Sequence, residues 1–255
     1  MIYDLQKASV LKRISAGILD FIIVMIVATG FFFLLSAIFN YDQLNSDYTA
    51  YYEEYKEIYG FDFREVTLDT YNGYTQEQKL NYDTAYAALT SDQGFVTAYN
   101  LVINTTLLVV TFGILLAVMI VEFFVPLFLK NGQTVGKKVF GICLMSTNGV
   151  KVSNRALFIR TLLGKFTIET MIPVYFIIML LFGNANVLFL FLGAALIIAQ
   201  LLIMIVTKTN SLIHDLMSYT VVVDKESQMI FETYEELIKY KEEHAKGRVN
   251  SIKTF

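Results

Sequence analysis

The chain has 255 residues, of which 55% are hydrophobic and only 17% are charged, and its formal net charge is −3 at pH 7. This composition is too apolar for an ordinary soluble domain and predicts a membrane protein. A single cysteine excludes an intramolecular disulfide framework and a zinc site built on paired cysteines. We therefore expect no metal, no cofactor and no nucleic-acid partner.

Four segments are long and apolar enough to cross a bilayer, which takes about 20 residues of helix. They cover residues 14–39, about 101–129, 155–182 and 187–206. The third opens with Arg160 and Lys165, so we expect an interfacial start and a span from about Phe166. The first run exceeds the apolar length of a signal peptide, and no small-residue cleavage site follows it, so we expect it to remain as a helix.

Lysine and arginine predict the orientation, because positively charged loops stay on the cytoplasmic side. Residues 40–98 hold only three of the 20 basic residues: Lys56, Arg64 and Lys79. We therefore expect a multi-pass protein of the cell membrane with both termini and the 130–155 loop in the cytoplasm. Residues 40–98 and the short turn 183–186 would face outward.

The segment 40–98 is acidic and rich in tyrosine, with 11 acidic residues against three basic ones. One helix is predicted to end at Gly60, and a capping box of Thr75 with Gln78 predicts the start of another. Between them, residues 63–74 are predicted to form a turn with strand-like residues. The segment either recruits cations or an outer partner, or is a solvated helical hairpin whose aromatic rings pack together on the membrane surface.

Three carboxylates interrupt the apolar segments: Asp20, Glu122 and Glu169. Each costs about 2.5–3.5 kcal/mol at the centre of a membrane helix, so such groups usually face a protein interior. Clustered carboxylates with raised pKa values would bind a proton or sodium. Alternatively, the acids pair permanently with basic residues and fix how the helices dock. The candidate basic partners are Arg13, Arg160 and Lys165.

Residues 131–153, "NGQTVGKKVFGICLMSTNGVKVS", begin like a phosphate-binding loop. Only three residues separate the glycines, and Lys138 replaces the required hydroxyl, which excludes that interpretation. The pattern predicts a cytoplasmic hairpin of "KVFGICLM" and "VKVS", with "YTVVVD" as a further strand. This cap would bring His214 and Asp215 toward Arg13, turn Lys137 and Lys138 toward anionic lipid headgroups, and bury Cys143.

Three ordered motifs resemble the RDD family of polytopic membrane proteins. "RISAGILD" resembles its R-x-x-A-x-x-x-D opening, "GQTVGK" its G-Q-T-x-G-K segment, and "HDLMSYTVVVD" its H-D-L-x-A-G-T-x-V-V ending. The resemblance covers roughly residues 8–40 and 100–224, with a longer outer loop, and Ser218 and Tyr219 stand where the family prefers Ala and Gly. It implies a polar seam of Arg13, Asp20 and Asp215. The implied cytoplasmic motif residues are Gly132, Gln133, Thr134, Gly136 and Lys137.

These observations predict an all-α membrane protein: four transmembrane helices, a helical extracytoplasmic insertion and a small β-like cytoplasmic cap. Residues 1–39 would hold the N-terminal cytoplasmic segment and the first transmembrane helix, and residues 40–98 the acidic, tyrosine-rich insertion. The RDD core, with transmembrane helices two to four and the cap, would occupy residues 99–224. Residues 225–255 would be a charged cytoplasmic tail, helical at first and frayed at its end.

Two functions follow. The resemblance implies a link to sodium and proton exchange, for which Asp20, Glu122, Glu169 and His214 are the candidate ion- or proton-binding residues. Four spans are few for a transporter, so a homo-oligomer would be needed. The alternative is a non-catalytic adaptor that binds membrane partners through its outer hairpin and cap. We expect no enzyme, because no nucleophile is spaced to use His214 and Asp215.

Overall fold

The computed structural model describes residues 5–129, 131–181 and 187–252. The expected outer turn at 183–186 and the last residues of the tail, 253–255, lie outside these ranges. The chain divides into two compact units. We call Met1–Ala28 with Ile114–Phe255 the core unit and Thr29–Gly113 the insertion unit. Helices α1 and α5 each contribute residues to both units.

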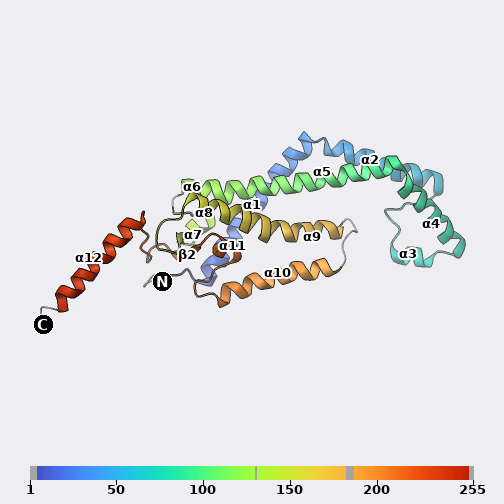
Figure 1. Cartoon of the computed structure of the whole chain (residues 1–255). Helices are drawn as coiled ribbons and strands as arrows, with labels where there is room; N and C mark the ends of the chain where they lie inside the picture. Colours follow the sequence, from blue (N-terminus) through green and yellow to red (C-terminus); the bar gives the residue numbers. More distant parts are fainter. Residues whose placement is uncertain (1–4, 130, 182–186, 253–255) are drawn as a thin grey trace. The chain divides into compact units, whose positions relative to one another are not determined.

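Three helices are long and apolar enough to cross a membrane (Figure 1). They are α1 (Val10–Ile38), then α5 (Gln93–Val118) continued by η1 (Met119–Phe124) and α6 (Val125–Phe128), and finally α8 (Asn154–Ile159) continued by η2 (Arg160–Met171) and α9 (Ile172–Leu181). A further apolar helix is α10 (Val187–Val206), whose described apolar stretch is Phe191–Val206. These helices indicate a multi-pass membrane protein. The third of these helices is continuous from Asn154, close to the start of the expected segment 155–182.

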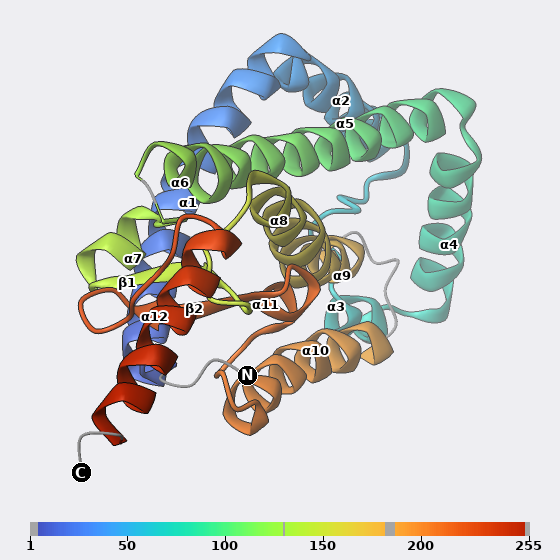
Figure 2. The same cartoon turned by 60° about the vertical axis from the view of Figure 1, so that its left-hand side comes forward.

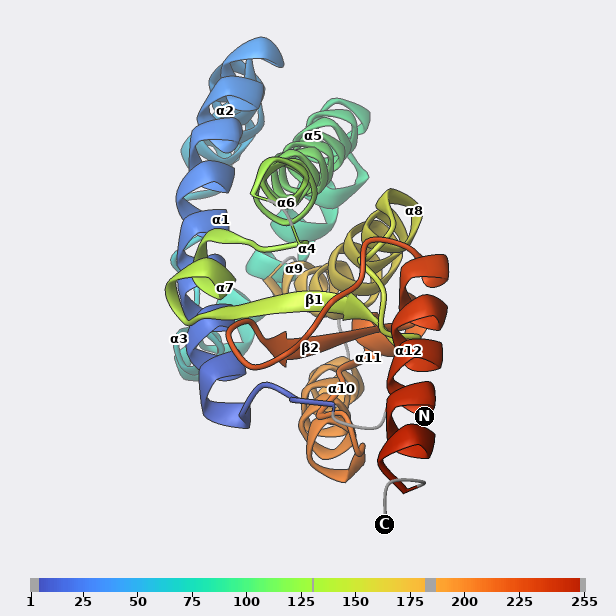
Figure 3. The same ribbon diagram turned by 90° about the vertical axis from the view of Figure 1, so that its left-hand side faces the viewer.

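A small cap joins α7 (Val135–Val139), β1 (Ile142–Ser146), α11 (Ile213–Met217) and β2 (Thr220–Asp224). The two strands are antiparallel, with Ile142 opposite Asp224 and Ser146 opposite Thr220, and Figure 3 shows them side by side. The expected hairpin of β1 with "VKVS" is reduced to one bridge, between Met145 and Lys151. The reason is that β2 offers five residues to pair, whereas Ser153 already caps α8.

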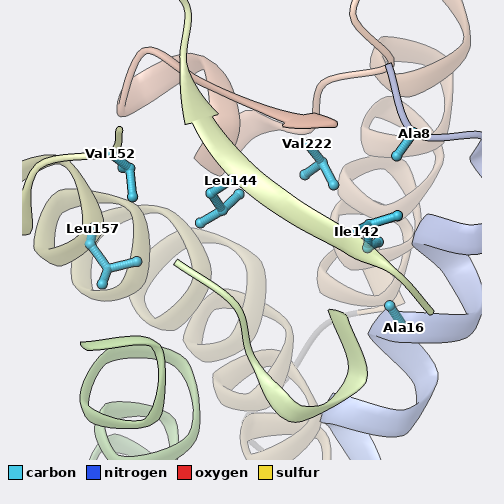
Figure 4. Packing of buried hydrophobic residues seen from close by; sticks show 7 residues of the cluster. All are labelled: Ala8, Ala16, Ile142, Leu144, Val152, Leu157 and Val222. Carbon is cyan, nitrogen blue, oxygen red and sulfur yellow. The ribbon is translucent and has the colours of Figure 1, made fainter. Parts of the chain in front are cut away.

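Side chains alternate between the two faces of this sheet, as the strand period of two requires. One face packs with α1, α8 and the N-terminal segment, and Figure 4 shows its cluster: Ala8, Ala16, Ile142, Leu144, Val152, Leu157 and Val222. The other face buries Cys143, Met145, Val221 and Val223. Apolar packing on both faces anchors the cap to the helices, and the expected burial of Cys143 is confirmed.

The insertion unit contains α2 (Tyr41–Tyr59), α3 (Leu68–Gly73) and α4 (Gln76–Ser91). The predicted helix stop is confirmed, because Gly60 caps α2 in the left-handed conformation at φ 77°. The capping box of Thr75 and Gln78 is confirmed as well. The expected strand-like turn was wrong over α3, where the Thr67 side chain accepts a hydrogen bond from the Thr70 amide and starts a helix.

Aromatic rings form the core of the insertion unit. Phe95 lies within 6.2 Å, centroid to centroid, of the rings of Tyr48, Tyr51, Tyr52 and Tyr99. This cluster is continued by Phe63, Ala85 and Leu89, which are buried. The tyrosines of this acidic segment therefore act mainly as packing residues. The tail begins as expected with a helix, α12 (Tyr234–Ile252), which is drawn in red in Figure 2.

Candidate functional site

Asp215 lies at the centre of the charged residues in the core unit. Its carboxylate is fully buried and accepts hydrogen bonds from Arg13 of α1 and Arg160 of η2. The Leu212 amide donates to the same carboxylate at 3.0 Å, and Arg160 also reaches the Thr220 hydroxyl at 3.0 Å. Burial alone would raise the pKa of Asp215, but Arg160, His214 and Arg13 overcome this and hold it well below its usual value. Asp215 therefore joins two membrane helices to the cap as an anion.

Asp20, the other aspartate of the seam, has different partners. It does not pair with Arg13. Its carboxylate accepts hydrogen bonds from the Thr134 hydroxyl and, at 2.7 Å, from the Gly136 amide, and the Lys137 ammonium lies 3.9 Å away. Asp20 thus caps the first turn of α7 from a neighbouring helix, where an anion complements the exposed amides.

The segment "GQTVGK" proves to be a docking element in which each motif residue has its own task. Gly132 adopts φ +60°, a conformation that favours glycine. The Gln133 amide donates to the Ile142 carbonyl at 2.8 Å and holds β1. A side chain at Gly136 would place its Cβ 2.3 Å from the Ala16 carbonyl, so only glycine lets α7 approach α1 this closely. The motif fixes the cap to α1 through Asp20.

Lys137 corrects the expectation that both motif lysines face lipid headgroups. Lys138 is exposed, but Lys137 is buried, with its ammonium 3.6 Å from a Glu122 carboxylate oxygen and 3.1 Å from the Thr134 hydroxyl. Lys165 pairs with the other oxygen of Glu122. Burial lowers the pKa of Lys137 to about 8, against the attraction of Glu122. Lysine lies inward here because the buried acid needs a positive partner.

A π-helix brings three charged residues of the third span to one side. In an α-helix successive residues turn by about 100°, which would place Arg160 and Glu169, nine residues apart, on opposite faces. In a π-helix, whose hydrogen bonds join residues i and i+5, the turn is roughly 80° and nine residues complete about two turns. Both residues lie in η2 with Lys165 between them. The unusual winding therefore aligns Arg160 and Glu169 on the site.

Glu169 pairs with His214 and not with Lys165. The His214 Nδ1 atom lies 2.7 Å from both carboxylate oxygens, and the His214 amide donates to one of them at 3.1 Å. The other ring nitrogen is 3.5 Å from Asp215. Gly164 permits this contact, because a Cβ there would lie 2.4 Å from the His214 Cβ. Burial and the neighbouring Arg160 lower the pKa of His214, so the ring is held neutral over a wider pH range.

The structure thus brings the sequence-predicted acids into one connected region of the core unit, each with a basic partner. The sequence analysis had named Arg160 and Lys165 only as candidate partners. It had missed Thr134 as the donor to Asp20 and Lys137 as a partner of Glu122. Among the described residues, no group of three or more metal-binding side chains is positioned to hold a metal ion.

A cavity of about 270 Å³ adjoins these residues in the core unit. Its wall includes Arg13, Asp20, Lys137 and His214 together with apolar residues of α1 and α10. Gln200 also lines it, and the sequence analysis overlooked this residue. The available signal was plain, since Gln200 is the only residue with a polar side chain in the 20 residues of α10.

Comparison with known proteins agrees with this geometry. The family model described as "RDD family" matches residues 7–219, which include the first two motifs and the beginning of the third. The chain therefore belongs to the RDD family of membrane proteins. No match was found to curated proteins or to solved structures.

Proposed function

We propose that this protein is a non-catalytic membrane adaptor: its core unit is a rigid anchor, and its insertion unit binds a partner protein. The observation that carries the proposal is the pairing of the buried charges. Asp215 has two arginines, and Glu122 has two lysines. Carboxylates bound in this way hold helices together, because separating them would leave buried charges without partners.

The insertion unit has the character of a binding surface for a basic partner. It carries 11 acidic and three basic residues, and its interior is an aromatic core. Several acidic residues of α2 and the following loop are exposed: Glu53, Glu54, Glu57 and Glu65. Complementary charge speeds association and selects partners more than it adds affinity. We therefore expect the partner to present lysine and arginine.

The adaptor proposal is tested with a charge variant that leaves the aromatic core intact. Glu54→Gln, Glu57→Gln and Glu65→Gln together should weaken capture of a co-purifying partner and make the remaining capture less sensitive to salt. The matched control neutralises three exposed acids of α12: Glu235→Gln, Glu242→Gln and Glu243→Gln. Equal capture by both triple variants, and by a chain lacking residues 43–97, would reject the proposal.

The adaptor model includes a topology: four spans in the cell membrane, with both termini in the cytoplasm and residues 40–98 outside. The positive-inside pattern of the sequence supports it. Cys143 is fully buried, so the natural chain should react little with thiol reagents. In intact cells a membrane-impermeant reagent should label Ser46→Cys and spare Glu243→Cys until the cells are opened. The reverse labelling pattern would overturn this topology.

Proton-coupled cation transport is the second candidate, and one observation favours it. His214 lies on the cavity wall while its ring contacts Glu169, which is a suitable arrangement for passing a proton. Reconstituted vesicles with an internal pH dye should then respond to added sodium, and His214→Gln should abolish the response. Vesicles that show no pH change with sodium, lithium or potassium would exclude this function.

A further inference from the structure

The cavity of the core unit has an apolar side and a charged side. Its apolar side comes from α1 and α10, through Ile14, Ile197, Leu201 and Met204. Its polar side comes from the ion-paired region and from Gln200. The volume of about 270 Å³ lies near the lower end of the range for small-molecule sites, roughly 300–1,000 Å³. A ligand that suits both sides must itself be amphipathic.

The charge of the wall selects the sign of the ligand. Among the residues that line the cavity in the described part of the chain, four are basic: Arg13, Lys137, Arg160 and Lys165. The only carboxylate on the wall is Asp20, and its two oxygens already accept hydrogen bonds from Thr134 and Gly136. Asp215 and Glu122 neutralise the bases from behind the wall. Although the paired charges largely cancel, the polar side chains of the wall are mainly hydrogen-bond donors, and such a wall suits an anion that accepts hydrogen bonds.

Two residues of the cavity wall each carry a donor that has no partner among the described residues. The Arg13 Nη1 atom is buried and makes no hydrogen bond, although the neighbouring Nη2 donates to Asp215. Within the described residues the Gln200 amide makes no hydrogen bond either, and it projects from an otherwise apolar helix. An unsatisfied guanidinium donor and an isolated amide are both costly in an apolar setting unless a ligand accepts from them. Both residues line the same cavity.

We propose that this cavity binds the headgroup of an anionic membrane phospholipid. The phosphate would accept hydrogen bonds from Arg13 and Gln200, and the lipid chains would lie along α1 and α10. A guanidinium suits phosphate because its planar donors match the oxygen geometry. Entry from the bilayer is direct, since Ile14, Ile197 and Leu201 belong to the cavity wall and are also at least 41% exposed. The site does not depend on the adaptor role of the insertion unit.

The absence of tryptophan provides a direct test. Leu201→Trp places the only tryptophan on the cavity wall, and Leu202→Trp is its control, because Leu202 is similarly exposed on α10 but does not line the cavity. Each variant is reconstituted in phosphatidylcholine vesicles with a minor fraction of phosphatidylglycerol whose acyl chains are brominated. We expect quenching of the Leu201→Trp protein at roughly fivefold lower phosphatidylglycerol content, the factor for one charge contact at a membrane surface.

Blocking variants distinguish a built site from general lipid contact. Gly17→Leu should fill the cavity, because Gly17 lines it and has open space at its Cβ position, and Gly30→Leu on the same helix has equally open space away from the cavity. Gly17→Leu and Gln200→Leu should remove the preference, and Gly30→Leu should retain it. Equal quenching of both tryptophans, or a preference that survives Gly17→Leu, would overturn the proposal. Loss of the preference on adding inorganic phosphate would assign the site to a small anion and overturn the lipid assignment.

Partner capture by the Glu54, Glu57 and Glu65 triple variant is measured separately from lipid quenching. A failed adaptor test therefore leaves the lipid site unaffected, and a failed lipid test leaves the adaptor role unaffected.

Discussion

The core unit and the insertion unit are held together by different kinds of interaction. In the core unit, buried charges on different helices are paired, with Asp215 between Arg13 and Arg160. In the insertion unit, the interior consists of stacked and edge-to-face rings around Phe95, and the ion pairs lie near the surface, as between Lys56 and Asp62 at 2.8 Å. Charged residues are therefore part of the interior of the core unit, whereas in the insertion unit they lie near the surface.

This difference predicts in which unit a change of charge alters the stability. A buried ion pair adds little net stability compared with apolar packing, but removing one member leaves the other charge stranded in a low dielectric. A pair in water loses little, because solvent and salt screen it. Substitutions that remove a charge should therefore destabilise the core unit much more than the insertion unit. Substitutions that remove buried apolar packing should destabilise either unit.

The largest effect is expected from Asp215→Asn. The variant leaves the guanidinium groups of Arg13 and Arg160 buried without their counter-charge, which should cost about 3–5 kcal/mol of unfolding free energy. Thermal unfolding in detergent micelles, followed by circular dichroism, measures the loss. The matched control is Asp62→Asn in the insertion unit, which should unfold almost like the natural protein. A small loss in Asp215→Asn would mean that the charges of the core unit are solvated.

The converse substitution is Phe95→Ala, which removes the central ring of the insertion unit. Truncating a buried phenylalanine costs about 3–5 kcal/mol, because a cavity remains. The loss should be local, so hydrogen exchange should rise in α2 and α4 while the cap strands stay protected. Leu68→Ala is the control, since Leu68 is 77% exposed. Equal exchange increases in the cap would show that the two units unfold together.

Periodicity and local chemistry allowed much of this fold to be predicted from the sequence. The apolar runs predicted the long helices, the β-branched run "TVVVD" predicted β2, and the capping box predicted the start of α4. Asp215 beside Arg13 followed from the resemblance and from the expected cap. These features depend on neighbouring residues or on a strong family pattern, which a single sequence contains.

The partners inside the site could not be predicted in the same way. Lys165 was named as a candidate partner of the buried acids, but η2 winds as a π-helix and Glu169 contacts His214. Lys137 was expected at anionic lipid headgroups, but it is buried beside the carboxylates of Glu122 and Asp20. Long-range partners and unusual winding are set by tertiary packing, which periodicity does not encode.

A smaller effect is expected where the cap docks on α1. In Gly136→Ala the new methyl group would lie 2.3 Å from the Ala16 carbonyl, so the backbone must shift, at a cost of about 1–3 kcal/mol. Gly17→Ala on α1 is the control, because its Cβ meets no atom within 4 Å and alanine favours helix. Thermal unfolding of both variants measures the difference. Unchanged stability of Gly136→Ala would show that α7 is loosely docked.

The smallest expected effect is a pH dependence carried by His214. Its pKa is lowered in the folded protein, so the unfolded chain binds more protons as the pH falls below about 6.5, and stability declines there until the folded-state pKa is passed. The charged groups that face the ring are Glu169 and Arg160 of η2 and Asp215 of α11. The melting temperature should therefore drop more between pH 7.5 and pH 5.5 in the natural protein than in His214→Gln.

In the insertion unit, hydrogen exchange should change equally in both proteins over this range, because no histidine lies there. An identical drop in melting temperature would mean that the histidine keeps its ordinary pKa and that Glu169 and Asp215 stabilise its charged form fully.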